Sequence, residues 1–282
     1  MQFSLIRLVG LNKGDHLMKD YGDNLFKGTA WYYSRYRPLY SSTLIRYLRI
    51  KFSLDGNGNM LDLGCGDGRL SLRFSDWFEN VVGLDIEPEM IQEAETISRD
   101  IRAENTEWLI GDLDKYKCNN NKTFRLVTIA KAFHWMDRPQ ALESLYEMIV
   151  IGGGIAVIDN YSPNEVLLPW QQTVQEVVKH WYGNERRAGN ITYSHPTVTH
   201  QEIISNSKFD LEIHQLPSYE QIWTLDSIIG NHYSTSFGAK RFLGENVDLF
   251  EKHLKEELLA VDKNGVFKEQ INTSVKLALK TR

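Results

Sequence analysis

The chain has 282 residues, of which 42% are hydrophobic and 24% charged, and its formal net charge is −5. These proportions are close to globular averages and argue against a disordered chain, a collagen-like repeat or a coiled coil, while the negative charge argues against non-specific coating of nucleic acid or anionic membranes. The two cysteines, Cys65 and Cys118, are too few for a disulfide framework, which favours a reducing compartment.

Neither of the two segments that could suggest export or membrane insertion has the required pattern. The first ten residues, MQFSLIRLVG, are interrupted by Arg7 and are followed by no small-residue cleavage site, so they do not predict a secretory leader. The longest run without a charged or strongly polar residue covers 11 residues, 148–158, whereas a membrane-spanning helix needs about 18–20. We therefore expect a cytoplasmic protein.

Strand and helix patterns alternate from about residue 60 onward. Short apolar runs predict five buried strands, and amphipathic or capped segments between them predict helices. This alternation is typical of an α/β fold with a parallel sheet covered on both faces. The predicted strands are residues 60–63, 81–85, 108–110, 126–130 and 155–158; the predicted helices are residues 69–78, 88–101 and 137–149, the last ended by glycines 152–154.

The second half of the chain has a less regular pattern. Residues 170–181 and 226–259 are mainly helical, whereas 211–216, 219–224 and 266–279 have strand character. We expect one domain over residues 1–282: N-terminal lid helices in 1–55, a cofactor-binding half in 56–160, and lid insertions with the last two strands in 161–282.

The strongest motif is the segment LDLGCGDG at residues 61–68, which runs from a strand through closely spaced glycines into a helix. Asp85 ends the next strand, 21 residues after Gly64, where a carboxylate can accept hydrogen bonds from both hydroxyls of a ribose. A dinucleotide loop would need a third glycine at position 69, which is Arg69, and Asp67 would repel a pyrophosphate. The loop therefore favours a nucleoside with a cationic or amino-acid end over NAD.

With residues 82–85, 111–113 (GDL) and 132–135 (AFHW), this motif resembles the class I S-adenosylmethionine-dependent methyltransferases. Within that family the chain is most similar to the small-molecule branch that includes trans-aconitate methyltransferase-like proteins. The likeness covers residues 30–160 and, in layout only, the remainder. It implies a Rossmann-like, doubly wound sheet of seven mostly parallel strands with an antiparallel last strand and helical lid insertions.

The resemblance also implies S-adenosylmethionine as the cofactor and a set of residues around it. The glycine loop would lie beneath the methionine part, Asp85 would bind the ribose, and Ile86 would lie against the adenine. Asp112 would accept a hydrogen bond from the adenine amino group, to which Leu113 would add its backbone N–H, although a turn role also explains Asp112. The predicted cofactor-binding residues are Gly64, Cys65, Gly66, Asp85, Ile86, Met90, Asp112, Leu113, Ala132, Phe133 and Tyr33.

His134 and Trp135 follow the fourth predicted strand, at the edge of the sheet where the site is expected. Methyl transfer is an in-line displacement, so alignment of the two reactants can supply most of the rate. If the acceptor is a hydroxyl or a protonated amine, His134 is the candidate base; it can equally be a histidine that only shapes the wall. Trp135 is expected to be a wall residue on the substrate side.

A basic and aromatic segment, residues 31–40, precedes the sheet. It is either a solvated amphipathic helix or a lid helix whose Arg35 or Arg37 offers a fork to an anionic acceptor. Arg186 is a further candidate substrate contact. An RNA-binding strip is disfavoured because the basic run is short, and no histidine or cysteine cluster has metal-ligand spacing.

The sequence thus predicts transfer of the methyl group of S-adenosylmethionine to oxygen or nitrogen of a small, anionic or carboxylate acceptor. The alternatives are a non-catalytic, regulatory protein that binds the same cofactor and, less favoured, an RNA methyltransferase. The predicted partner is the small-molecule acceptor, with no metal, nucleic acid or membrane, and the chain is expected to be a monomer or a homodimer.

Overall fold

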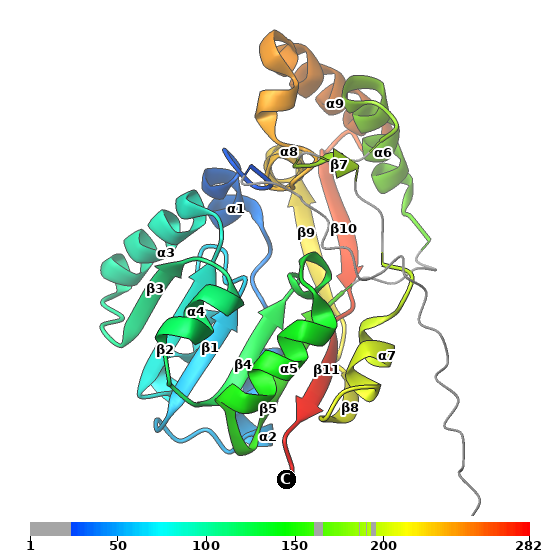
Figure 1. Cartoon of the computed structure of the whole chain (residues 1–282). Helices are drawn as coiled ribbons and strands as arrows, with labels where there is room; N and C mark the ends of the chain where they lie inside the picture. Colours follow the sequence, from blue (N-terminus) through cyan, green and yellow to red (C-terminus); the bar gives the residue numbers. More distant parts are fainter. Residues whose placement is uncertain (1–23, 161–165, 186, 190, 193–195) are drawn as a thin grey trace, which may run out of the picture.

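The structure is a computed structural model, and it describes residues 24–160, 166–185, 187–189, 191–192 and 196–282. Two parts are distinguished in Figure 1. The first, called the floor, is a seven-stranded sheet with the helices that cover its two faces. The second, called the lid, consists of helices α6, α8 and α9 on a two-stranded ribbon that rises from one side of the floor.

The sheet of the floor confirms the predicted fold class. Its first five strands in the chain run parallel to one another, whereas β11 is inserted antiparallel between β5 and β8. Across the sheet the order is β3 (Thr106–Ile110), β2 (Asn80–Asp85), β1 (Asn59–Leu63), β4 (Phe124–Ala130), β5 (Ile149–Asp159), β11 (Ser274–Leu279) and β8 (Asp210–Gln215).

The central strands are buried on both faces because helices cover both, and their residues are therefore almost all apolar. One face packs on α4 (Leu113–Asn119), α5 (Arg138–Met148) and α7 (His200–Ser205). The other packs on α2 (Ser42–Lys51) and the 3₁₀ helix η1 (Ser71–Trp77), and α3 (Pro88–Ile101) contacts β2 and β3. A second 3₁₀ turn, η2 (Phe133–Trp135), follows β4.

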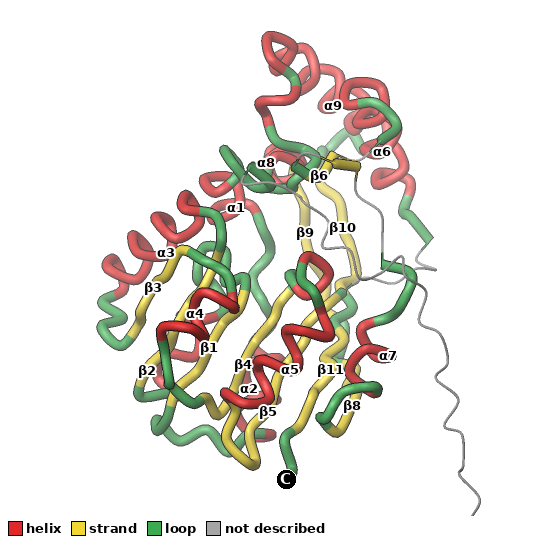
Figure 2. Tube along the Cα trace, in the orientation of Figure 1, coloured by secondary structure: helices red, strands yellow, loops and turns green. Residues whose placement is uncertain are grey.

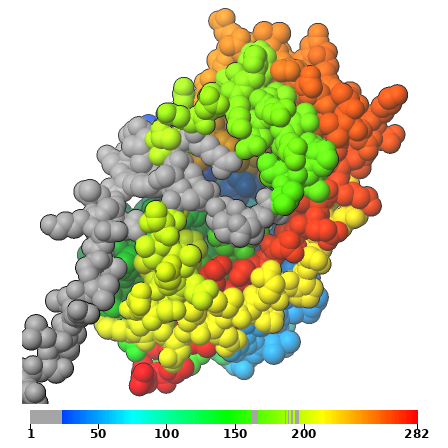
Figure 3. Space-filling model, turned by 90° about the vertical axis from the view of Figure 1, so that its right-hand side faces the viewer, coloured from blue at the N-terminus to red at the C-terminus, as the bar shows by residue number. Residues whose placement is uncertain are grey.

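The lid has a hydrophobic core of its own, built from aromatic and aliphatic side chains of its three helices and its ribbon. Helix α1 (Ala30–Tyr36) packs against α8 and so lies where the lid meets the floor. Figure 3 shows α6 and α9 above α7 and β8 on one side of the molecule. The lid elements are β9 (Tyr219–Thr224), β10 (Val266–Ile271), α6 (Pro169–Tyr182), α8 (Leu225–Tyr233) and α9 (Val247–Val261), with the turns η3 (Lys240–Phe242) and η4 (Gly244–Asn246) and the short pair β6 (Arg187–Ala188) and β7 (Ile191–Thr192).

The ribbon of the lid is a continuation of two strands of the floor, as Figure 2 shows. Strand β8 leads into β9, and β10 leads into β11, so the same two chain segments pair below and above a break. At the break, residues 216–218 stand opposite residues 272–273, one residue more on the first segment than on the second. Pro217 lies at this break, where the absence of a backbone N–H removes no hydrogen bond between paired strands. The N–H of Leu216 donates to the carbonyl of Thr273 at 3.0 Å.

Two details of the predicted floor are wrong. The helix expected at 69–78 is the 3₁₀ helix η1, and glycines 152–154 do not end a helix but lie inside β5. Helix α5 already ends at Met148. The glycines are needed for strand packing: a Cβ at Gly153 would lie 2.6 Å from the carbonyl oxygen of Arg125, and one at Gly154 would lie 2.7 Å from that of Ala278.

Two details of the predicted second half also differ from the structure. The helical segment 226–259 is divided into α8 and α9 by residues 234–246, which contain two glycines and the turns η3 and η4. The single strand expected at 266–279 is two strands, β10 and β11, which belong to different sheets. Among the described residues, no helix is long and apolar enough to span a membrane.

Candidate active site

A cleft opens at the carboxyl ends of β1, β2, β3 and β4, the edge at which open parallel sheets bind ligands. Its volume is about 1210 Å³, including space open to solvent. The walls come from the loops after these strands, from α1 and from the segment just before α1. The lining residues are Leu25, Phe26, Tyr33, Leu63, Gly64, Gly66, Leu84, Asp85, Ile86, Met90, Gly111, Asp112, Leu113, Asp114, Ala130, Lys131, Ala132, Trp135, Met136, Asp137, Gln140 and Ala141.

The glycine loop after β1 forms the bottom of the cleft. Gly64, Gly66 and Gly68 have φ angles of 73°, 55° and 74°, in the left-handed region that favours glycine. A Cβ at Gly64 would lie 2.5 Å from the Cβ of Ala132, so this loop can approach the end of β4 only without a side chain there. The ring of Tyr33 from α1 packs on Gly66, 3.4 Å from where its Cβ would be.

Asp85 joins the end of β2 to this loop. Its Oδ2 accepts a hydrogen bond from the N–H of Gly66 at 2.8 Å, and its Oδ1 accepts one from the N–H of Glu87 at 2.9 Å. Burial raises the pKa of Asp85, although these backbone donors oppose the rise. Each carboxylate oxygen can accept a second hydrogen bond, and the side chain lines the cleft. The geometry therefore fits recognition of a ribose diol.

Next to Asp85, the cleft has an apolar wall and one further carboxylate. Ile86 is 54% exposed and Met90 is buried beside it, so an apolar surface is available to a flat ring. Asp112 is the N-cap of α4: its Oδ1 accepts from the N–H of Lys115 at 2.8 Å, and its Oδ2 lies 3.5 Å from that residue's Nζ. Leu113 follows in the first turn and lines the cleft. Capping alone explains Asp112, and its carboxylate keeps further acceptor capacity.

Of the residues predicted near the end of β4, Ala132 and Trp135 line the cleft. Phe133 is buried in the core of the floor. The ring of His134 lies 4.5 Å from that of Trp135, centroid to centroid, and His134 is not a lining residue. Cys65 is buried beneath the glycine loop, where burial raises the pKa of its thiol well above the usual range.

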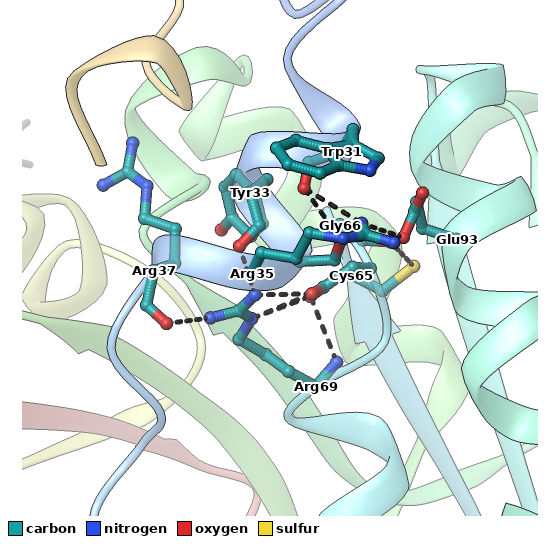
Figure 4. Close-up of polar contacts among 10 residues, drawn as sticks. Trp31, Tyr33, Arg35, Arg37, Cys65, Gly66, Arg69 and Glu93 are labelled. Atoms are coloured by element: carbon teal, nitrogen blue, oxygen red, sulfur yellow. Dashed lines mark hydrogen bonds and ion pairs between the residues drawn. The ribbon is translucent and has the colours of Figure 1, made fainter. Parts of the chain in front are cut away.

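Arg69, which occupies the position of the third glycine in a dinucleotide loop, ties α1 to the glycine loop (Figure 4). Its guanidinium forms a bidentate pair with Asp67, at 2.8 Å from Nε to Oδ1 and 2.5 Å from NH2 to Oδ2. It also donates to the carbonyl of Tyr33 at 2.5 Å and to that of Arg37 at 2.6 Å. The side chains of Arg69 and Asp67 are only 6% and 1% exposed, so α1 and the glycine loop are connected through a buried, bidentate ion pair.

The two candidate substrate-binding arginines of this segment point in different directions (Figure 4). Arg35 is 45% exposed and pairs with Glu93 of α3 at 3.2 Å, so it does not line the cleft. Arg37 follows the end of α1 and turns toward the lid, where its NH2 donates to the carbonyl of Ser234 at 3.4 Å. Its Nε is buried and has no hydrogen-bond partner among the described residues.

Twelve of the lining residues were not predicted, among them Leu25, Phe26 and Lys131. Phe26 packs edge-on against Trp135, with ring centroids 6.0 Å apart, and so helps to close one side of the cleft. Lys131 follows β4 directly, and a cation immediately after a buried strand is the signal that could have indicated it. No motif marks residues 25 and 26.

Two further predictions concern substrate charge and metals. Arg186 lies outside the described residues. In the part of the chain that the structure describes, no group of three or more His, Cys, Asp or Glu side chains is placed to hold a metal ion. The metal-free site stays a prediction.

The sheet order with its inserted antiparallel strand, the glycine loop after β1 and the acid that ends β2 define a class of protein. They are the features of the Rossmann-like fold of class I S-adenosylmethionine-dependent methyltransferases.

Comparison with known proteins supports this class. Residues 60–153 match the family described as "Methyltransferase domain". An uncharacterized methyltransferase of Schizosaccharomyces pombe is 24% identical over 155 residues, which cover 55% of this chain and 59% of that protein. The chain spans about half the length of the curated relatives it matches.

Solved structures show the same fold. The YcgJ protein of Bacillus subtilis superposes with a TM-score of 0.51 at 17% identity, covering 83% of this chain and 97% of that one. A phosphoethanolamine N-methyltransferase of Haemonchus contortus, solved with phosphomonomethylethanolamine and S-adenosylhomocysteine, gives a TM-score of 0.52 at 17% identity, covering 93% and 58%. Residues 60–153 thus match a methyltransferase domain, and the solved structures show that the chain has the fold of Rossmann-like methyltransferases.

Proposed function

We propose that this chain transfers the methyl group of S-adenosylmethionine to an oxygen or nitrogen atom of a small-molecule acceptor and releases S-adenosylhomocysteine. The observation that carries the proposal is the geometry of Asp85, which lines the cleft and is held by the N–H groups of Gly66 and Glu87. The cofactor supplies a methyl group made electrophilic by the sulfonium, so the protein's main task is to hold and align two reactants.

The proposed cofactor contacts follow the walls of the cleft. Asp85 binds the ribose hydroxyls, and Ile86 and Leu113 pack on the adenine, whose amino group donates to Asp112. The methionine part lies over the glycine loop, residues 64–68, beside Tyr33. Cys65 and Phe133 do not line the cleft, and both are buried. We propose that they support the cofactor-binding residues by packing.

We favour transfer over a role in binding alone because the cleft is also lined by residues outside the proposed cofactor contacts. These include Ala130, Lys131 and Trp135, which we propose as walls beside the acceptor. Phe26 and Tyr33 cover the cleft from the side of α1 and limit access of water. His134 packs on Trp135 instead of lining the cleft, so we propose that positioning supplies the rate and that His134 fixes this wall.

The finer assignments rest on fewer observations. The trans-aconitate-like branch and an anionic acceptor are supported by Arg37, whose positive charge acts on Lys131 of the cleft, whereas Arg35 is engaged with Glu93. We further propose that residues 1–55, 56–160 and 161–282 act as one catalytic unit. Helix α1 supports this view, because it contacts both the glycine loop and α8.

Isothermal titration calorimetry with S-adenosylhomocysteine tests the proposal. The wild type should bind, and Asp85→Ala should bind at least about 30-fold more weakly because a charged acceptor of hydrogen bonds is lost. Asp100→Ala, which removes an exposed carboxylate of α3, is the matched control and should bind like the wild type. A folded wild type that does not bind, or an Asp85→Ala variant that binds normally, contradicts the proposal.

Turnover is tested separately from binding. A cell extract is incubated with the protein and trideuteromethyl S-adenosylmethionine, and small molecules carrying the labelled methyl group are identified by mass spectrometry. A labelled product that depends on the protein supports transfer. Binding without any labelled product favours the regulatory alternative.

A further inference from the structure

Lys131 has an unusual backbone conformation at the edge of the cleft. Its φ angle is 57°, in the left-handed region, which is unfavourable for a residue with a Cβ. The other two described residues of this kind, Ser53 and Arg102, come directly at the ends of α2 and α3, where a left-handed residue commonly terminates a helix. Lys131 ends a strand instead, where its N–H still donates to the carbonyl of Ile158 at 2.9 Å.

The ammonium group of Lys131 has no charged partner in the described part of the chain. No described carboxylate lies within 4.0 Å of its Nζ, which lies 6.0 Å from the centroid of the Tyr40 ring. Burial, with the positive charges of Arg37 and Arg69, lowers the pKa of Lys131 to about 8, although the carboxylates of Asp159 and Glu269 oppose the fall. A cation is thus held in a partly buried place without an ion-pair partner among the described residues.

Three buried carboxylates around the cleft form no ion pair with Lys131, because each has other partners. Asp67 is paired with Arg69, and Asp85 accepts from backbone N–H groups. Asp62 accepts from the hydroxyls of Ser71 and Thr128, each at 2.6 Å. Asp159 and Glu269, which raise the pKa of Lys131, act on it from beyond ion-pair distance.

Strain and desolvation at one residue both lower stability, and residues that combine such costs cluster at functional sites. A glycine at position 131 would avoid both costs. We propose that Lys131 binds an oxyanion, carboxylate or phosphate, of the methyl acceptor at the β4 end of the cleft, with the charge of Arg37 in support. This inference rests on the proposed function and deepens it by naming the chemical class of the acceptor.

The test is a titration of the protein saturated with S-adenosylhomocysteine, using benzoate, inorganic phosphate and, as a neutral analogue, benzamide. We expect benzoate or phosphate to bind the wild type, and Lys131→Met to weaken that binding about tenfold or more. Arg37→Gln should weaken it less. Comparison of benzoate with phosphate tells which oxyanion the site prefers. The affinity for benzamide should be the same in the wild type and in every variant.

Two controls separate the possible failures. Arg46→Gln, which removes an exposed charge from α2, should bind the anions as the wild type does. Lys131→Gly should melt no lower than the wild type, because the strain is relieved, and should still lose anion binding; a lower melting temperature counts against the argument from strain.

The outcome is decisive at each step. If the wild type binds S-adenosylhomocysteine but neither anion, or if Lys131→Met keeps full anion affinity, the assignment of Lys131 is wrong while the proposed function stands. If the wild type does not bind S-adenosylhomocysteine at all, it is the proposed function that fails.

Discussion

The floor and the lid solve different structural problems. In the floor, ligand-facing positions come from backbone loops that follow buried strands, and Gly64 and Gly66 shape the surface without side chains. In the lid, the packing comes from large side chains such as Tyr233 and Phe250, brought together from distant parts of the chain. A surface made of backbone is restricted by the fold, whereas one made of side chains can change with each substitution.

The difference suggests a division of labour in the proposed reaction. The floor holds the cofactor, which the proposed reaction requires whatever the acceptor is. Acceptor recognition falls to residues near the lid and α1, including Lys131 and Arg37. Helix α1 connects the two parts, because Tyr33 packs on the glycine loop while Tyr36 packs on Gly230 of α8.

The largest effect is expected where α1 is tied to the floor. Arg69→Met would leave Asp67 buried without its partner, and such a change costs about 3–5 kcal/mol. Urea unfolding measures this loss. The double variant Asp67→Asn with Arg69→Met should recover part of it, because no uncompensated charge remains. A loss below about 1 kcal/mol for the single variant would show that the pair is unimportant for stability.

A smaller effect is expected in how the stability of the floor and the stability of the lid depend on pH. In the floor, burial raises the pKa of Asp62 to about 6. The folded chain thus keeps a proton between about pH 4 and pH 6 that the unfolded chain has released, so stability falls as the pH rises through this window. Relative to Asp62→Asn, the wild type should lose about 3 kcal/mol of unfolding free energy from pH 4 to pH 7.

The lid provides the opposite response. Burial lowers the pKa of His232 to about 3, whereas the unfolded chain takes up a proton below about pH 6.5. The contribution of His232 to stability therefore falls as the pH drops from about 6.5 to about 3. Relative to His232→Phe, the wild type should gain stability as the pH rises. A pH-independent difference for either variant would contradict the corresponding burial.

The junction between α1 and the lid should be less sensitive. A Cβ at Gly230 would lie 2.2 Å from ring atoms of Tyr36, so Gly230→Ala forces the two helices apart. Overpacking of this kind costs about 1–3 kcal/mol in urea unfolding. Adding Tyr36→Ala removes the clash, and the two substitutions together should cost less than their separate effects summed. Strict additivity would mean that the two residues do not meet.

The smallest effect is expected at Arg35. Its pair with Glu93 is exposed, so Arg35→Gln should change the unfolding free energy by less than about 0.5 kcal/mol. Binding of benzoate or phosphate to the protein saturated with S-adenosylhomocysteine should also stay unchanged. A loss of anion affinity in this variant would restore Arg35 as a substrate contact.

The sequence predicted the floor well because its signals are local. Buried strands such as residues 126–130 are continuous apolar runs, and the glycine loop with Asp85 has a spacing that few other folds require. The structure accordingly places both at one edge of the sheet. The seven-stranded order with its antiparallel strand came from the family resemblance, since no local pattern encodes it.

The remainder could not be read from local patterns. Spacing puts Arg35 and Arg37 on one helix, yet α1 ends at Tyr36 and the backbone of Arg37 is extended, so the two side chains diverge. The lid strands are half exposed, and their partners are more than forty residues away along the chain, as with Trp223 and Phe267. The strain at Lys131 depends on how β4 leaves the sheet, which residue type alone does not show.

The extra residue at 216–218 changes which residues of β9, odd-numbered or even-numbered, face the same side of the ribbon as Phe267. In β8, the even-numbered His214 lies on the face toward α2, where it stacks on Tyr47; in β9, the odd-numbered Trp223 faces the lid core. Without the extra residue, the pairing of β8 with β11 would continue upward and set Ile222, not Trp223, opposite Phe267. The count of residues at one bend, more than their identity, thus decides whether Trp223 or Ile222 faces the lid core.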